Sequence, residues 1–95
     1  MLMNDDEKSK IERVFHQVEQ GQTEFILTEL ETAITFCDVA RSTTNPERRT
    51  RNIANADKGY QTALHFLQTA NHDLKNSPAF QERLAYLERL LRELR

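Results

Sequence analysis

Two dipeptides constrain the fold of this chain more than any other feature: Asn45-Pro46 and Ser77-Pro78. An Asn or Ser side chain just before a helix accepts a hydrogen bond from an early backbone N–H. Pro suits the first helical position because its missing N–H would have no partner there. These two helix starts predict three helical segments, at approximately residues 6–43, 46–74 and 78–95. With only two Gly and two Pro in 95 residues, tight β-hairpins are disfavoured, so we expect an all-α fold.

Each predicted segment carries apolar residues spaced alternately by three and four, which places them on one face of a helix. In the first segment these are Ile26, Leu30, Ala33, Cys37 and Ala40. In the middle segment they are Ile53, Ala56, Tyr60, Ala63, Leu67, Ala70 and Leu74. In the last segment they are Phe80, Leu84, Leu87, Leu91 and Leu94. Because the connections are short, neighbouring helices should run antiparallel, which predicts an up-down three-helix bundle in a single domain over 1–95.

The first segment contains a second apolar seam whose phase differs. Ile11, Phe15 and Val18 share one face, but this face shifts by a four-residue step at Gly21-Gln22 relative to the seam that follows. Either the helix breaks at this point, or one helix carries a local change of winding. A helix over 46–74 would be about 43 Å long, and an antiparallel partner of equal length would reach back to about residue 15. We therefore favour one long first helix, either straight or kinked at this point, over two separate helices.

The charge balance excludes several classes of partner. Thirteen basic residues against fifteen acidic residues give a net charge of -2, so nothing in the overall charge favours nucleic acid or an anionic membrane. Met1-Leu2-Met3 is followed at once by Asn4-Asp5-Asp6-Glu7, which lacks the cationic start and apolar run of a signal peptide. No apolar stretch approaches the roughly 20 residues of a membrane span. We expect a cytoplasmic protein that does not associate with membranes.

Catalytic and metal-binding patterns are absent from the sequence. No pair of histidines has the spacing of metal ligands on a helix; the three histidines are His16, His65 and His72. Gly21 and Gly59 are isolated, so no glycine-rich phosphate loop exists. The single cysteine, Cys37, lies on an apolar seam and should be a small buried hydrophobe. We predict no enzymatic activity, no cofactor, no metal and no small-molecule substrate.

Four arginines crowd the predicted turn between the first two helices: Arg41, Arg48, Arg49 and Arg51. The last three lie in the first turns of a helix, whose N-terminal end is already partially positive, so their charges are locally unfavourable. Glu47, four residues before Arg51, offsets part of this. We favour an ordinary solvated role, with the stem of Arg49 covering the end of the bundle. The alternative is an anion-binding site, although no aromatic residues interleave with these arginines as in nucleic-acid-binding proteins.

The middle segment contains the run Ala56-x-x-x-Tyr60-x-x-Ala63-Leu64, with small residues and one aromatic at helix-contact spacing. This run resembles the second helix of a tetratricopeptide (TPR) unit, and equally a helix of the three-helix microtubule-interacting-and-trafficking type. The stretch 30–67 also resembles small bacterial proteins of unknown function that contain one TPR-like hairpin. Its further matching pairs are Thr35-Phe36 and Ala40-Arg41. The first helix lacks the TPR pattern of an aromatic, Leu-Gly and Tyr, and no 34-residue repeat recurs. The resemblance implies a close-packed helical hairpin used for protein interaction.

Several large apolar residues flank the seams and exceed what one three-helix core should cover. The candidate interface residues are Phe25, Phe36, Phe66 and Tyr86; others of this kind are Leu27, Ile34, Val39 and Leu90. Uncovered apolar patches usually mark interfaces. The sequence therefore predicts a non-catalytic module that binds another protein or a second copy of itself. The alternative is a regulator that binds an anion or nucleic acid through the arginine-rich turn at 41–51.

Overall fold

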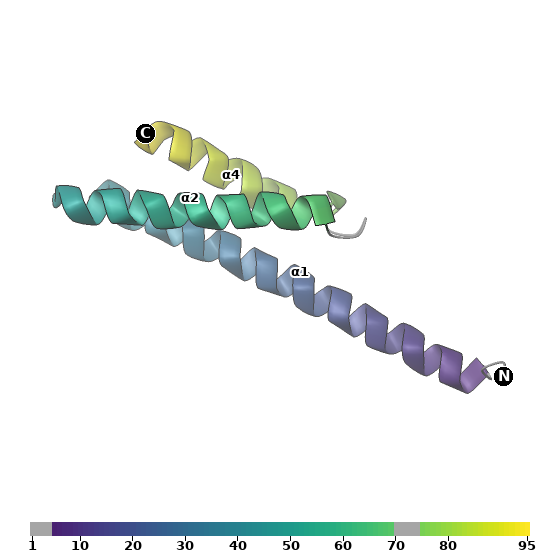
Figure 1. The fold of residues 1–95 in the computed structure, drawn as a ribbon. Coiled ribbons are helices and arrows are strands. Elements are labelled where there is room, and N and C mark those ends of the chain that lie inside the picture. Colours follow the sequence, from purple (N-terminus) through teal and green to yellow (C-terminus); the bar gives the residue numbers. More distant parts are fainter. Residues whose placement is uncertain (1–4, 70–74) are drawn as a thin grey trace.

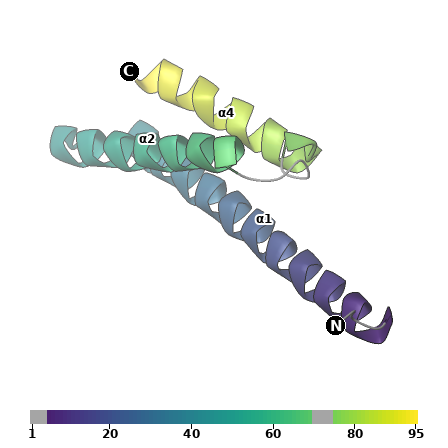
Figure 2. The same ribbon diagram turned by 45° about the vertical axis from the view of Figure 1, so that its right-hand side comes forward.

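The computed structural model describes residues 5–69 and 75–95, with side chains described from residue 21 onward in these ranges. It contains the helices α1 (Asp5–Ser42), α2 (Pro46–Thr69) and α4 (Pro78–Leu94). Helices α1 and α2 form an antiparallel hairpin, and α4 runs back along it (Figures 1 and 2). The described residues contain no strand, so the predicted all-α, up-down three-helix fold is confirmed.

Both predicted helix starts are present with the expected capping bonds. The backbone N–H of Arg48 donates to Asn45 Oδ1 over 3.0 Å, and the backbone N–H of Phe80 donates to Ser77 Oγ over 3.3 Å. Pro46 and Pro78 are the first residues of their helices. The middle helix is described as far as Thr69. The remainder of its predicted range, residues 70–74 with Ala70 and Leu74, lies outside the described residues.

Helix α1 is continuous through Gly21-Gln22. The alternative of two separate helices is therefore wrong, and the drawn helix has no sharp kink at this point (Figure 1). A single glycine inside a helix costs about 1 kcal/mol but leaves helical backbone angles available to it, and neither glycine has a positive φ. The phase shift between the two apolar seams consequently means that they face different directions on one helix.

The helices differ greatly in length. α1 has 38 residues, α2 has 24 and α4 has 17. At 1.5 Å per residue, α1 is about 57 Å long and α2 about 36 Å. The N-terminal part of α1 therefore projects beyond the other two helices (Figures 1 and 2), in a molecule that measures 64 × 20 × 17 Å. We call residues 5–18 of α1 the overhang, because a helix as long as α2, counted back from Ser42, ends at residue 19.

The core is built from unequal contributions of the three helices. α4 supplies the bulk, with Phe80, Leu84, Leu87, Leu90 and Leu91 buried. α1 buries its predicted seam, namely Ile26, Leu30, Ala33, Cys37 and Ala40. α2 buries only Ala56 and Ala63 fully, so its backbone can approach α1 closely. Leu90 was expected outside the core; it is buried because α4 packs a wider face than one seam against the hairpin. Leu27 and Ile34 also pack partly against this core.

The closest approach between α1 and α2 is at a glycine. A Cβ atom built on Gly59 would lie 2.8 Å from the Cβ of Ala33 and 3.7 Å from the carbonyl oxygen of Glu29. Real Cβ atoms essentially never come as close as 2.8 Å, so any residue larger than glycine at position 59 would force the neighbouring atoms to shift. The sequence predicted close approach at the alanines of α2, and the structure adds Gly59 to them.

Candidate functional site: the α1/α2 groove

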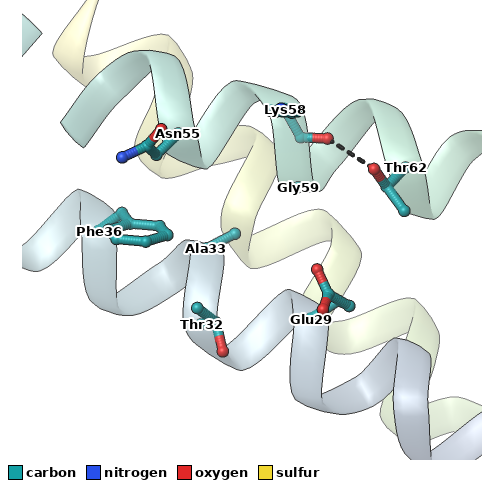
Figure 3. Close-up of a pocket in the computed structure, with 8 residues that line it drawn as sticks. All are labelled: Glu29, Thr32, Ala33, Phe36, Asn55, Lys58, Gly59 and Thr62. Carbon is teal, nitrogen blue, oxygen red and sulfur yellow. Dashed lines mark hydrogen bonds between the residues drawn. The ribbon is translucent and has the colours of Figure 1, made fainter. Parts of the chain in front are cut away.

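A groove of about 290 Å³ runs between α1 and α2. Figure 3 shows α4 behind the two helices, so the groove opens on the face of the hairpin that α4 leaves uncovered. Its lining residues are Glu29, Thr32, Ala33 and Phe36 from α1, and Asn55, Lys58, Gly59 and Thr62 from α2. We refer to this feature as the α1/α2 groove.

The floor of the α1/α2 groove is formed where Ala33 and Gly59, its two smallest lining residues, lie closest together. Phe36 and Asn55 stand at one end, and Glu29 and Thr62 at the other (Figure 3). The Thr62 hydroxyl donates to the carbonyl oxygen of Lys58 over 3.0 Å, so it is satisfied within its own helix. The floor of the groove thus consists of two small residues, and its walls carry one aromatic side chain and several polar side chains.

A pair of aromatic rings extends this line of residues past Glu29 and Thr62. Phe25 precedes Glu29 by one turn on α1, and Phe66 follows Thr62 by one turn on α2. Their ring centroids are 6.0 Å apart with a 46° tilt, which is a favourable aromatic geometry. Phe25 remains 52% exposed despite this contact. The structure therefore brings Phe25, Phe36 and Phe66, three of the four predicted interface residues, onto one face of the hairpin.

The fourth predicted interface residue, Tyr86, lies elsewhere. It is on α4 and is 38% exposed, and the guanidinium of Arg89 lies 5.0 Å from its ring centroid. This cation–π contact uses one face of the ring. Tyr86 does not line the α1/α2 groove, and sequence spacing alone gave no means of separating it from the three phenylalanines.

Arg49 is a structural residue of the bundle end. Its Nη1 donates to the carbonyl oxygen of Ala40 over 3.2 Å, and its Nη2 donates to the carbonyl oxygen of Leu94 over 3.1 Å. These carbonyls belong to the C-terminal turns of α1 and α4, which lack helical partners and are partially negative. Arg49 lies at the bundle end, where the sequence placed its stem, but its guanidinium is bound to backbone carbonyls, and this side chain joins all three helices.

The other three arginines of the predicted cluster are exposed, and none of them lines the α1/α2 groove. Arg51 lies one turn before Asn55 on α2 and Arg48 lies about two turns before it, so both positions lie between the groove and the hairpin turn. Arg41 instead follows the buried Cys37 by one turn of α1. Arg49 is thus held at the bundle end by backbone carbonyls, whereas the other three arginines remain exposed.

Cys37 is fully buried in the core, as predicted. Burial raises the pKa of its thiol, and the nearby carboxylate of Asp38 raises it further. The positive charges of Arg41 and Arg95 lower the pKa by less than these two effects raise it. The thiol therefore stays protonated near neutral pH, where a nucleophile would need the thiolate.

A second hollow of about 230 Å³ lies between α2 and α4, next to Tyr60 and Leu91. Its charged residues are already paired with carboxylates. Arg92 lies 3.6 Å from Glu88, and Arg95 pairs with Asp57. Both arginines of this hollow thus lie beside a carboxylate of the same chain.

The described part of the chain contains no group of three His, Cys, Asp or Glu residues that could hold a metal ion. Of the histidines, only His65 has a described side chain, and it is exposed on α2; His72 and the side chain of His16 lie outside the described residues. None of the helices, within the residues the structure describes, has the length and apolarity needed to span a membrane.

No protein-family model, curated protein or solved structure matches this chain.

Proposed function

We propose that this chain is a non-catalytic protein-interaction module whose α1/α2 groove binds an amphipathic helix. One observation carries the proposal: three phenylalanines and a glycine–alanine floor follow one face of the hairpin that α4 leaves uncovered. A monomeric protein gains nothing from keeping Phe25 half in water, because burying a Phe side chain is worth about 1.5–3 kcal/mol. Apolar surface of this kind is typical of a docking site.

The shape of the groove favours a helix as its occupant. It lies between two antiparallel helices that touch closely at Ala33 and Gly59, so a third helix can sit over the crossing. Phe25 and Phe36 are about 16 Å apart along α1, which equals three turns of a bound helix. Anchors at such spacing are the usual basis of helix-in-groove recognition. Glu29 and Lys58 flank the floor and supply opposite charges to the polar edges of the occupant.

The resemblance of 30–67 to a TPR-like hairpin supports the same function, because hairpins of that type serve protein interaction. This stretch includes the part of α1 and the part of α2 that form the groove. On the same resemblance we propose that the protein is bacterial.

A groove-blocking variant tests the proposal. Thr32 is exposed on the groove wall, so Thr32→Arg should obstruct an incoming helix without disturbing the core. Thr35→Arg is the matched control, because Thr35 is exposed on the same helix but does not line the groove. Wild-type protein and both variants are immobilised as bait, and captured proteins are identified and then re-measured with purified components.

We expect a protein that binds wild type and Thr35→Arg equally and binds Thr32→Arg at least about tenfold more weakly, a loss of about 1.4 kcal/mol or more. If no binding, either to another protein or between copies of this chain, is weakened by Thr32→Arg relative to Thr35→Arg, the groove is not an interaction site and the proposal is wrong.

A further inference from the structure

We infer that the helix which fills the α1/α2 groove is the overhang of a second copy of this chain, so that two chains form a symmetric antiparallel dimer. This inference rests on the proposed function of the groove. Each chain then contributes one groove and one overhang, and the two contacts are equivalent by the two-fold axis, as in other isologous dimers.

The overhang is a helix that lacks a partner among the described helices. Residues 5–18 of α1 continue beyond the reach of α2 and α4 (Figures 1 and 2). Isolated helices shorter than about 12–15 residues are marginal in water even with good helix formers. The overhang is not isolated, because it continues the packed part of α1, but most helical stability in proteins comes from packing of an apolar face. The open groove of a second copy supplies such packing.

The apolar residues Ile11, Phe15 and Val18 of the overhang, which we call the overhang seam, lie in line with the groove along α1. Eighteen residues make about five complete turns of an α-helix, so positions Ile11, Phe15 and Val18 lie on the same line of α1 as Glu29, Ala33 and Phe36. These last three residues line the groove. Because seam and groove face the same side of one straight helix, a single two-fold rotation lays each overhang on the groove of the other chain.

The spacings of the two segments match when the helices run antiparallel. The overhang seam has steps of four and then three residues. The lining residues Phe36, Thr32 and Glu29, read backwards along α1, have the same steps. In this register Ile11 of the second copy lies opposite Phe36, and Val18 of the second copy lies opposite Glu29. The exposed ring of Phe25 then lies close to the two-fold axis, where it is covered by its symmetry mate.

The charges at the ends of this pairing are complementary. The same register places Asp6 of the second copy level with Arg41 on α1. Ala33 on α1 lies beside Gly59 on α2, so in this antiparallel pair Arg41 is level with Arg51. Arg48 lies one turn further along, toward the hairpin turn. Carboxylates of the incoming Asp5-Asp6-Glu7 thus approach two arginines whose charges are otherwise unfavourable at a helix N-terminus. In the dimer, the carboxylates of the second copy therefore offset the unfavourable positive charges at the N-terminal end of α2.

A reciprocal charge exchange tests this arrangement by sedimentation velocity over a range of concentrations. One variant carries Asp5→Lys and Asp6→Lys, and the other carries Arg48→Glu and Arg51→Glu. In the proposed dimer each variant alone places like charges together, whereas the heterodimer places opposite charges together at both ends. Arg89→Glu with Arg92→Glu on α4 is the control for the arginine variant, because it replaces two arginines by glutamates at exposed positions outside the groove.

We expect wild type and the α4 control to dimerise, and each exchange variant alone to dimerise at least about tenfold more weakly in low salt. An equimolar mixture of the two variants should form heterodimers with near wild-type affinity. Wild type that is monomeric up to about 1 mM, or a mixture that stays as weak as its components, overturns the inference. If the wild type is monomeric but binds another protein, and Thr32→Arg weakens that binding, the dimer is refuted while the proposed function stands.

Discussion

The glycine at the helix crossing gives the sharpest quantitative test of the packing. Gly59→Ala introduces one methyl group that would lie 2.8 Å from the Cβ of Ala33. In an unobstructed helix interior, exchanging Gly for Ala stabilises by about 1 kcal/mol. Overpacking a tight contact costs about 1–3 kcal/mol, and here the obstructing atom is fixed to the backbone of α1 and cannot rotate away. We therefore expect a net loss of about 1 kcal/mol in the free energy of unfolding.

Two companion variants separate the steric term from the propensity term. A Cβ atom added at Gly21 would meet no neighbouring atom within 4 Å, so Gly21→Ala should raise stability or helicity, by up to about 1 kcal/mol. Ala33→Gly placed together with Gly59→Ala moves the methyl group from one helix to the other and removes the clash. We expect the two substitutions to be coupled favourably, by about 1–2 kcal/mol in a double-mutant cycle.

Urea unfolding followed by circular dichroism at 222 nm measures these differences, since a shift in midpoint at constant slope reports stability directly. A loss of about 1 kcal/mol should also lower Tm by about 4–8 °C in a domain of this size. If Gly59→Ala stabilises the protein as much as Gly21→Ala does, the two helices are not in close contact at this point, and the floor of the groove is misplaced.

Three further predictions follow from single contacts. Arg49→Met should lower the free energy of unfolding by about 1–3 kcal/mol, because it removes two charge-assisted bonds to carbonyls; the same change at exposed Arg48 should cost less than about 0.5 kcal/mol in urea unfolding. Ser77→Ala should cost about 1 kcal/mol by loss of the helix cap, and an unchanged midpoint would contradict that bond. The raised pKa of Cys37 means that its thiol stays protonated to a higher pH in the folded state than in the unfolded state. The free energy of unfolding should therefore be unaffected by this thiol below the unfolded pKa of about 8.5 and should fall as the pH rises above it. Cys37→Ala should remove that part of the decline, and identical pH profiles for the two proteins would show that burial does not shift this thiol.

Local interactions explain which features could be predicted from the sequence. The caps at Asn45 and Ser77 act within three residues of themselves, so their helix starts were recognisable without tertiary information. The apolar period predicted the buried face of each helix, including Cys37. Arg49 was likewise expected at the bundle end, although its bonds to the carbonyls of Ala40 and Leu94 were not predicted. Each of these depends on spacing along one helix, and spacing is explicit in the sequence.

Tertiary packing decided what remained open. Whether α1 broke at Gly21 depended on whether any neighbouring helix required a turn there, and the sequence does not state which helices adjoin. The groove depends on the register between two helices, which brings Phe25 to Phe66 across 41 positions of the chain and leaves Tyr86 on a different face. Glycine is favoured at position 59 only because Ala33 lies opposite it. Such pairings arise from the joint packing of all side chains at the crossing, so no local pattern within one helix specifies them.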